Sequence, residues 1–556
     1  MKKLTTFILP LLYLSQSYEA NAATTLDENT QNLIKGIIDP TPNILSNKFW
    51  DLDSQAVVDQ SENFQNMGEA VSAGDFNNDG YEDLAVGIPG FDLLTINSVG
   101  TVVVLYGTAN GLSGNNSQLL FQTFVTIPSN TENDNGVEEN DRFGTVLASG
   151  DFNCDGFVDL AVGTPDEDVT FVGDGGTPRN DVGAVNIFYG SANGFADNGQ
   201  GSTFLLQGTG TGSNTTYVSA GDKFGFAMAV GNFNNDFDSG HVCWDLAISA
   251  PYENFGNNDS IVNAGQVDVF YGSVAGIDGS DRETISQNSN GVSDSSEDND
   301  LFGYSLAAGR LQVLPAGTDL AIGIPGESGG GLTEAGAVQV FYSGGNGLMV
   351  SVNDEIWTQD SSGILGLAES DDKFGNSLAI ANFDGAGGDD LAIGVYEEDL
   401  NADGIIDAGA VNVIYSTVNG LTSAGNQLFY QLNAGLQGDP QSFDRFAEKI
   451  TAGDLNYDGL ADLVIGVPSK ASSAGAFHVI YGNANGLTTL NDDYFQNNLG
   501  GDILATSMVI GDFGNGPELA AGLTGYNSAD NNINSGAVQV FEFINPDIIF
   551  KNGFED

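Results

Sequence analysis

The feature that most constrains the fold is one segment that the chain repeats. In its first copy, an Asp-x-Asn-x-Asp-Gly loop at residues 75–80 leads into a short apolar segment, residues 84–86, which ends at Gly-x-Pro. Oxygen-bearing side chains at alternate positions of a tight loop suit a hard cation such as Ca²⁺, which takes about six to eight oxygen ligands. The glycine allows the backbone to turn sharply. The segment therefore combines a candidate cation loop with a candidate buried strand.

Three sequence blocks recur in constant order and define seven copies of this unit. Each copy opens with a Phe-Gly pair or its substitute, continues with a segment like Asp-Leu-Ala-Val-Gly-x-Pro, and then has one like Gly-Ala-Val-x-Val-Phe-Tyr. Apolar and variable positions alternate in the last of these, which is typical of a half-buried strand. A looser fourth strand follows. The first block begins at Met67, Phe143, Phe224, Phe302, Phe374, Phe446 and Leu504.

The repeat predicts an all-β, seven-bladed β-propeller of four-stranded blades over residues 46–543. A unit of roughly 70 residues with four short strands and no helical period matches a propeller blade, whereas open β-solenoids use shorter repeats. The last copy ends after its third strand, and an orphan strand candidate, residues 49–52, precedes the first copy. We therefore expect the N-terminal strand to complete the seventh blade and close the ring.

Four loops have the spacing of a calcium site, with side chains at positions one, three, five and nine and a backbone carbonyl at position seven. A single loop of this kind could be an Asx-rich turn that binds nothing, but its repetition favours Ca²⁺ at about four sites. The third copy is stretched by an insertion before Asp245, and the fourth and seventh lack ligands. The candidate ligands are Asp75, Asn77, Asp79, Tyr81 and Asp83; Asp151, Asn153, Asp155, Phe157 and Asp159; Asp399, Asn401, Asp403, Ile405 and Asp407; and Asp454, Asn456, Asp458, Leu460 and Asp462.

The charge of the chain limits the classes of partner. Lys and Arg number 14 against 75 Asp and Glu, which gives a net charge of −61. Such a charge repels nucleic acids and anionic lipid surfaces, so these partners are excluded. An extracellular protein or a glycan remains.

The ends of the sequence predict export. Residues 1–22 have the charged start, apolar core and small-residue cleavage site of a signal peptide, and the apolar run is too short to span a membrane. Residues 23–45 are expected to form a polar leader and residues 544–556 a C-terminal tail, and no other segment could cross a bilayer. Cys154 and Cys243 occupy corresponding loops of neighbouring copies. In an oxidising compartment such a pair favours a disulfide, and two free thiols are the alternative.

Few residues suit nucleophilic or acid–base catalysis. The two histidines are His241, in the insertion of the third copy, and His478, in a variable strand position that we expect on a blade surface. Basic residues recur directly before the Phe of the repeat and are expected to pair with neighbouring acids; they are Arg142, Lys223, Lys373 and Arg445. Catalysis is therefore the minority hypothesis.

These motifs resemble a known family. Phe143-Gly144, followed by a cation loop and then by Gly163-Thr164-Pro165, is similar to the FG-GAP repeat of the integrin α-subunit head, and the resemblance covers roughly residues 46–543. It implies a seven-bladed propeller that holds Ca²⁺ in hairpin loops on one face, through Asp75, Asn77, Asp79, Asp83 and their counterparts in the second and sixth copies. The loop at Asp399 lies outside the family's usual position, and the resemblance does not imply a receptor function.

Together these observations favour an exported calcium-binding propeller that acts as a binding or adhesion module for a protein or glycan. Loop aromatic residues such as Tyr217, Phe255 and Tyr396 are candidate contacts. The alternatives are a calcium-dependent enzyme acting on polysaccharide and a surface or matrix protein without a discrete ligand. The sequence leaves the oligomeric state open.

Overall fold

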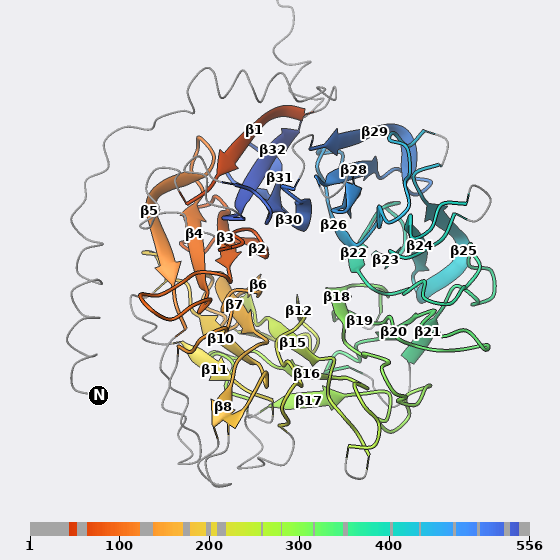
Figure 1. Ribbon diagram of the computed structural model, residues 1–556, viewed down its shortest axis with the longest axis horizontal. Helices are drawn as coiled ribbons and strands as arrows, with labels where there is room; N and C mark the ends of the chain where they lie inside the picture. Colours follow the sequence, from red (N-terminus) through yellow and green to blue (C-terminus); the bar gives the residue numbers. More distant parts are fainter. Residues whose placement is uncertain are drawn as a thin grey trace, which may run out of the picture.

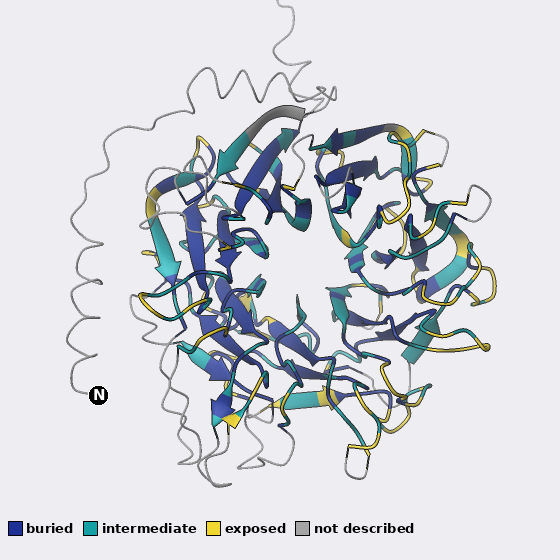
Figure 2. Cartoon of the chain, viewed as in Figure 1, coloured by how far each residue is buried: buried dark blue, intermediate teal, exposed yellow. Residues whose placement is uncertain are grey.

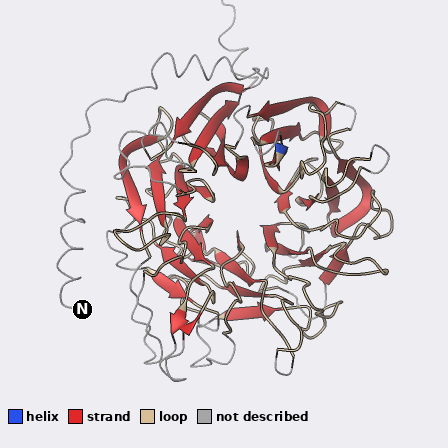
Figure 3. Cartoon of the chain, in the orientation of Figure 1, coloured by secondary structure: helices blue, strands red, loops and turns tan. Residues whose placement is uncertain are grey.

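The structure is a computed structural model in which strands dominate (Figure 3). It describes residues 44–52, 64–122, 137–170, 178–195, 202–207, 218–238, 240–256, 259–279, 281–314, 317–348, 354–400, 404–432, 435–470, 474–497, 501–527 and 534–543. The predicted signal peptide, nearly all of the predicted leader and the predicted tail lie outside these ranges.

Seven antiparallel four-stranded sheets form the blades of a ring (Figure 1). In six of them, the four strands form a meander in chain order. Their strands are β2 (Val71–Gly74), β3 (Asp83–Ile88), β4 (Thr101–Tyr106) and β5 (Ser113–Leu120) in blade 1; β6 (Val146–Gly150), β7 (Asp159–Thr164), β10 (Ala184–Phe188) and β11 (Thr203–Leu205) in blade 2; β12 (Met228–Gly231), β15 (Asp245–Ala250), β16 (Gln266–Phe270) and β17 (Arg282–Ile285) in blade 3; β18 (Ser305–Gly309), β19 (Asp319–Ile324), β20 (Ala337–Phe341) and β21 (Asp354–Trp357) in blade 4; β22 (Leu378–Ala381), β23 (Asp390–Val395), β24 (Ala410–Thr417) and β25 (Gly420–Phe429) in blade 5; and β26 (Lys449–Gly453), β27 (Asp462–Val467), β28 (Ala476–Tyr481) and β29 (Thr488–Gln496) in blade 6.

The seventh blade joins the two ends of the array, as predicted. It contains β30 (Leu504–Asp512), β31 (Pro517–Leu523) and β32 (Ala537–Phe543), and its outer strand is β1 (Ile44–Trp50). β1 pairs antiparallel with β32, with Trp50 opposite Val538. The first strands of successive blades contact one another in a closed circuit that returns from β30 to β2. The ring is thus held by strand pairing between the two ends.

Packing between blades explains the apolar second strands. All six residues of β3 and all six of β15 are buried, and the burial map shows the same band around the ring (Figure 2). The buried apolar clusters cross from blade to blade; one of them joins Val185 of blade 2 to Leu246 of blade 3. Because burying one such side chain contributes about 1.5–3 kcal/mol, each blade depends on its neighbours for stability.

Close contacts between the backbones of neighbouring blades involve the recurring glycines and the residue before the Phe. A Cβ at Gly87, in the Gly-x-Pro of blade 1, would collide with the carbonyl of Gly144 in the Phe-Gly pair of blade 2. The residue directly before the Phe is left-handed in all seven copies, although none is glycine; these residues are Asn66, Arg142, Lys223, Leu301, Lys373, Arg445 and Ile503. The Phe-Gly and Gly-x-Pro blocks therefore recur because they meet between blades.

Two short hairpins interrupt the meanders. β8 (Val169–Thr170) pairs with β9 (Pro178–Arg179) in blade 2, and β13 (Phe237–Asp238) pairs with β14 (His241–Val242) in the insertion of blade 3. Within the described ranges, no helix has the length and apolar character needed to traverse a membrane.

Candidate metal centre

The first predicted cation loop folds as a compact turn built by its own side chains. The Asp75 carboxylate accepts hydrogen bonds from the backbone N–H groups of Asp79, at 3.0 Å, and Gly80, at 2.9 Å. Asn77 Oδ1 also accepts from Asp79 N, and Asp79 Oδ1 accepts from Tyr81 N, at 2.9 and 3.1 Å. Gly80 has a φ of 92°, which the turn requires. The local sequence therefore shapes the loop.

The second and sixth loops repeat this geometry bond for bond. In the second, Asp151 accepts from Asp155 N at 3.0 Å and from Gly156 N at 2.8 Å. In the sixth, Asp454 accepts from Asp458 N at 3.2 Å and from Gly459 N at 2.9 Å. The remaining bonds run from Asp155 N to Asn153, from Phe157 N to Asp155, from Asp458 N to Asn456 and from Leu460 N to Asp458. Three predicted sites are thus one structure placed three times around the ring.

The ninth residue of the loop has a structural role that the sequence did not reveal. Asp83 is fully buried; its Oδ2 accepts from Phe76 N at 2.9 Å, and its Oδ1 accepts from Gly107 N, after β4, at 2.8 Å. One carboxylate thus ties the loop before β3 to the end of the third strand. The same two bonds recur at Asp159, Asp245, Asp319, Asp390 and Asp462.

This tie does not depend on the cation ligands. Asp319 makes both bonds although its loop has Arg310 and Gln312 at positions one and three. The recurrence of the ninth residue is therefore explained by strand pairing, and positions one, three and five carry the argument for a cation.

The electrostatics of the complete loops suit a cation. Burial raises the pKa of Asp83 to about 7, against the opposing backbone hydrogen bonds, and the nearby Asp75 and Asp79 raise it further. Burial likewise raises the pKa of Asp159 to about 8 and that of Asp462 to about 7. The donors are carboxylate, amide and carbonyl oxygens, which is the set that Ca²⁺ prefers. In the described part of the chain, no three Asp, Glu, His or Cys side chains form a preassembled metal site. The ligand assignments therefore remain predictions.

The fourth predicted loop is described only in part. The Asp399 carboxylate accepts from Asp407 N at 2.8 Å, and Leu400 and Ile405 pair through their backbones. Asn401 and Asp403 lie outside the described residues. The ends of this loop are thus close together, as a closed hairpin requires.

The second loop is linked to blade 3 by the predicted disulfide. Cys154, inside the loop, is bonded to Cys243, which directly follows β14, with their Cα atoms 4.8 Å apart. In the same insertion, the His241 ring lies against Gly156. The insertion of the third copy therefore covers the loop of the second, a contact that the sequence did not predict.

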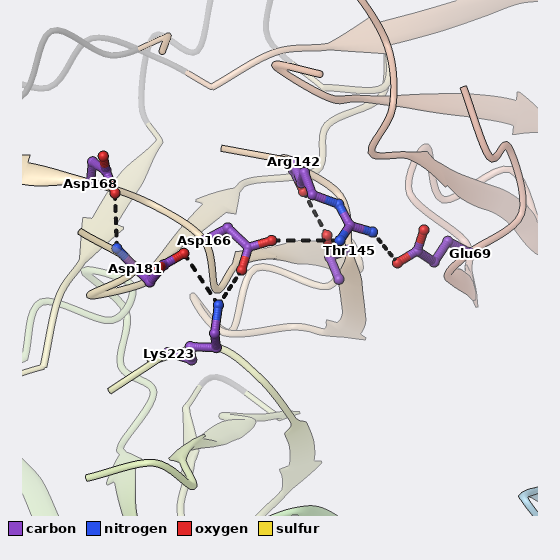
Figure 4. Close-up of polar contacts among 7 residues, drawn as sticks. All are labelled: Glu69, Arg142, Thr145, Asp166, Asp168, Asp181 and Lys223. Carbon is purple, nitrogen blue, oxygen red and sulfur yellow. Dashed lines mark hydrogen bonds and ion pairs between the residues drawn. The ribbon is translucent and has the colours of Figure 1, made fainter. Parts of the chain in front are cut away.

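The basic residues before the Phe pair with neighbouring acids, as expected, and the structure shows that these pairs bridge neighbouring blades; Figure 4 shows the contacts of Arg142 and Lys223. Arg142 lies between Glu69, at 2.6 Å, and Asp166, at 3.7 Å. Lys223 contacts the same Asp166 at 2.5 Å and Asp181 at 3.2 Å. Lys373 pairs with Glu334, and Arg445 pairs with Glu397. These pairs are partly exposed, so each contributes less than about 1 kcal/mol.

The predicted surface position of His478 is wrong. His478 is fully buried between Asp492, at 3.5 Å, and Gln431, and burial lowers its pKa. Asn186 and Asn412, in the equivalent strand position, are also fully buried. This face of the sheet packs against the preceding blade: Ala476 and Ile480, on the same face as His478, cluster with Val413 of blade 5. His478 is therefore part of the packing between blades.

Among the candidate contact aromatics, Tyr396 stacks with Arg445 at 5.3 Å, and Tyr217 lies outside the described residues.

The family comparison agrees with the geometry of the loops. A model described as FG-GAP repeat matches residues 67–105, 143–185 and 446–480. The chain carries FG-GAP repeats. The matched segments are the first, second and sixth copies, which hold the three loops of identical geometry. Together with the ring of seven sheets, this makes the chain an FG-GAP β-propeller.

The FG-GAP propeller has distant relatives among curated proteins. It is 29% identical over 247 residues to a phosphatidylinositol-glycan-specific phospholipase D of Bos taurus, which covers 44% of this chain and 25% of the relative. It is 27% identical over 205 residues to integrin alpha pat-2 of Caenorhabditis elegans, covering 35% and 15%, respectively. It is 32% identical over 126 residues to integrin alpha-PS3 of Drosophila melanogaster, covering 22% and 10%. The aligned part of the chain spans about a quarter of the length of the phospholipase.

Proposed function

We propose that this FG-GAP propeller is an exported, Ca²⁺-stabilised binding module that presents one face of its ring to an extracellular protein or glycan. The observation that carries the proposal is the triple occurrence of one loop geometry, with Asp75, Asp151 and Asp454 in the first position. Because every blade is built by the same meander, these loops lie on the same side of the ring. The disulfide between Cys154 and Cys243 supports export, since disulfides persist in oxidising compartments.

The residues of the chain shape the loops, and a bound cation would order them further. Asp83 and its counterparts fix the base of each loop to the third strand. Asp75, Asn77, Asp79 and the Tyr81 carbonyl would hold the ion. Ca²⁺, when bound, would neutralise the loop carboxylates and stabilise the folded state by mass action. The proposed consequence is a rigid rim that a partner can recognise without refolding it.

A calcium-dependent enzyme acting on a glycan substrate is the second candidate. The observation that favours it is the similarity to phosphatidylinositol-glycan-specific phospholipase D, whose name describes an enzyme specific for a phosphatidylinositol glycan. The region shared with those proteins is a quarter of their length, so the shared region supports a common module more than a common reaction.

One experiment separates the two candidates. Calcium-loaded protein is applied to a glycan array and used for pull-downs from native medium, with and without EDTA, while bound glycans are analysed for products. Calcium-dependent capture without product supports the binding module. Turnover of a bound glycan supports the enzyme, and capture that is unchanged by EDTA contradicts the role proposed for the loops.

A further inference from the structure

A second set of buried polar residues lies between successive blades, away from the candidate loops. Each set, here called a junction set, joins a Gln after the fourth strand of one blade to two acids of the next unit. One acid is the Asp two residues before the Phe, and the other is a Glu after the second strand. The four sets are Gln122, Asp141 and Glu167; Gln207, Asp222 and Glu253; Gln287, Asp300 and Glu327; and Gln359, Asp372 and Glu398.

The four junction sets share one hydrogen-bonding pattern. The Gln Nε2 donates to the Glu Oε2 at 2.6, 2.7, 3.0 and 2.7 Å around the ring. The Asp accepts the backbone N–H of the residue three positions earlier, at 2.5, 2.5, 2.6 and 2.6 Å. Each Asp is at most 2% exposed. The sets are therefore built parts of the junctions.

Each junction set leaves buried oxygens without a donor. The Oε1 atoms of Gln122, Gln207, Gln287 and Gln359 have no hydrogen-bond donor among the described residues, and none of these side chains is more than 5% exposed. A buried polar atom left unpaired costs about 1–3 kcal/mol. Unpaired oxygens beside two carboxyl groups therefore indicate a missing positive partner.

The electrostatics of the acids in the junction sets also favour a positive partner. Burial raises the pKa of Glu327, and the neighbouring Asp294 and Asp300 raise it further. At the second junction, burial and then Asp222 raise the pKa of Glu253, and Arg179 only weakly opposes the shift of Asp222. In the second and third sets, each Glu is therefore harder to ionise because of the neighbouring Asp.

The fifth junction supplies the missing partner from the chain itself. Here the set is Gln431, Asp444 and Lys470, with a Lys in place of the Glu. The ammonium lies 2.6 Å from Asp444 Oδ2 and 3.5 Å from Gln431 Oε1, and it also donates to the backbone carbonyl of Asp439. Lys470 is 3% exposed. At this junction, a cation occupies the centre and satisfies the Gln oxygen.

We propose that each of the four acidic junction sets binds a divalent cation of the Ca²⁺ class, held by the Asp carboxylate, the Glu carboxylate and the Gln Oε1. Replacing Lys by Glu changes the charge of the set by two negative units, which one divalent cation restores. Carboxylate and amide oxygens are also the ligands that Ca²⁺ takes in proteins. The ions would fasten one blade to the next, as the Lys470 ammonium does at the fifth junction.

The test exchanges the two kinds of junction in the full-length chain. Parent, Glu327→Lys and Lys470→Glu proteins are stripped with EDTA and dialysed against CaCl₂, and the bound calcium per chain is measured. Glu327→Lys copies the fifth junction and should bind one ion fewer than the parent. Lys470→Glu should bind one ion more, and it should melt lower than the parent in EDTA but recover in CaCl₂. Unchanged calcium content in both variants would overturn the proposal.

Two further measurements keep the result unambiguous. If Lys470→Glu does not fold in EDTA, the calcium content of Glu327→Lys alone decides. If Glu327→Lys changes the pH dependence of melting but not the calcium content, the set holds a shared proton and the cation proposal is wrong. Asp79→Ala, which removes a side-chain oxygen from the first loop alone, should reduce calcium binding separately; its failure would contradict the loop sites while leaving the junction sites standing.

Discussion

The loops of blade 1 and blade 4 share a scaffold but not a set of donors. Asp83 and Asp319 each accept two buried backbone hydrogen bonds, at 2.9 and 2.8 Å in blade 1 and at 3.0 and 2.8 Å in blade 4. Blade 1 then offers Asp75, Asn77 and Asp79, whereas blade 4 has an arginine, Arg310, that donates to the carbonyl of its own loop at Val313. The comparison shows that the aspartate that ties the loop to the third strand and the residues that would bind a cation are separate features of the loop.

The strongest challenge to this comparison is removal of calcium from the parent protein. If the complete loops bind Ca²⁺, EDTA should lower the free energy of unfolding by about 2.7 kcal/mol per site at a calcium concentration of about 100 times Kd. The three loops of identical geometry would together lose about 8 kcal/mol. Differential scanning calorimetry in CaCl₂ and in EDTA measures the shift. An unchanged melting temperature would mean that the loops of blades 1, 2 and 6 are as independent of calcium as that of blade 4.

Removal of the tie in blade 4 should have the next largest effect. Asp319→Ala leaves the N–H groups of Gln312 and Ser343 buried and unpaired, which costs about 4 kcal/mol for the two donors. The loss should be the same in CaCl₂ and in EDTA, as urea unfolding can show. Asp319→Asn keeps one acceptor and should lose roughly half as much. A calcium-dependent loss would show that blade 4 also binds the ion.

A pair of matched substitutions tests the loop positions themselves. Asp454→Ala removes the first donor of a complete loop and should lower the free energy of unfolding by about 3 kcal/mol in CaCl₂, with a smaller loss in EDTA. Asp512, in the shortened loop of blade 7, only accepts from Gly514 and Gly516, each at 3.0 Å. Asp512→Ala should cost about 1 kcal/mol in either buffer. Equal calcium contents for parent and Asp454→Ala would contradict the assignment.

Most of the fold could be predicted because the sequence repeat indicates the number of blades and the strands in each. Seven copies of the Phe-Gly and Gly-x-Pro blocks or their substitutes fix the number of blades. The orphan strand at Phe49 predicts the closure through β1 and β32. The three identical loops were also predictable, since Asp75 and its counterparts build the turn from local sequence alone. Local side-chain spacing and repeat counts are therefore sufficient for these features.

Features that depend on contacts between segments distant in the sequence could not be predicted from local spacing. His478 lies in a variable position of an alternating strand, as a surface residue would, yet the preceding blade covers it. The ninth loop residue was taken only as a ligand because its bond to Gly107 joins segments distant in sequence. The junction sets did leave a signal, a recurring Asp two residues before the Phe and a Glu or Lys two residues after the Pro position, but its meaning needs the partner Gln from the preceding blade.

The smallest expected effect is a pH dependence that distinguishes the tie from the ligands. Burial raises the pKa of Asp319 to about 7 from 3.8, and blade 4 has no set of loop acids whose charge a cation would offset. Because the folded-state pKa lies above the unfolded value, this group stabilises the fold fully below about pH 4, and the contribution is lost as the pH rises through 7. In EDTA, the melting temperature of the parent should therefore fall between pH 5 and pH 8, and Asp319→Asn should show a shallower fall.

Calcium distinguishes the contribution of Asp319 from that of Asp83. It should not change the part of the pH slope that comes from Asp319. It should reduce the part that comes from Asp83, whose pKa is raised by burial and also by Asp75 and Asp79. A slope in Asp319→Asn equal to that of the parent would show that the tie is ionised throughout this range, and the comparison between the blades would then rest on the ligands alone.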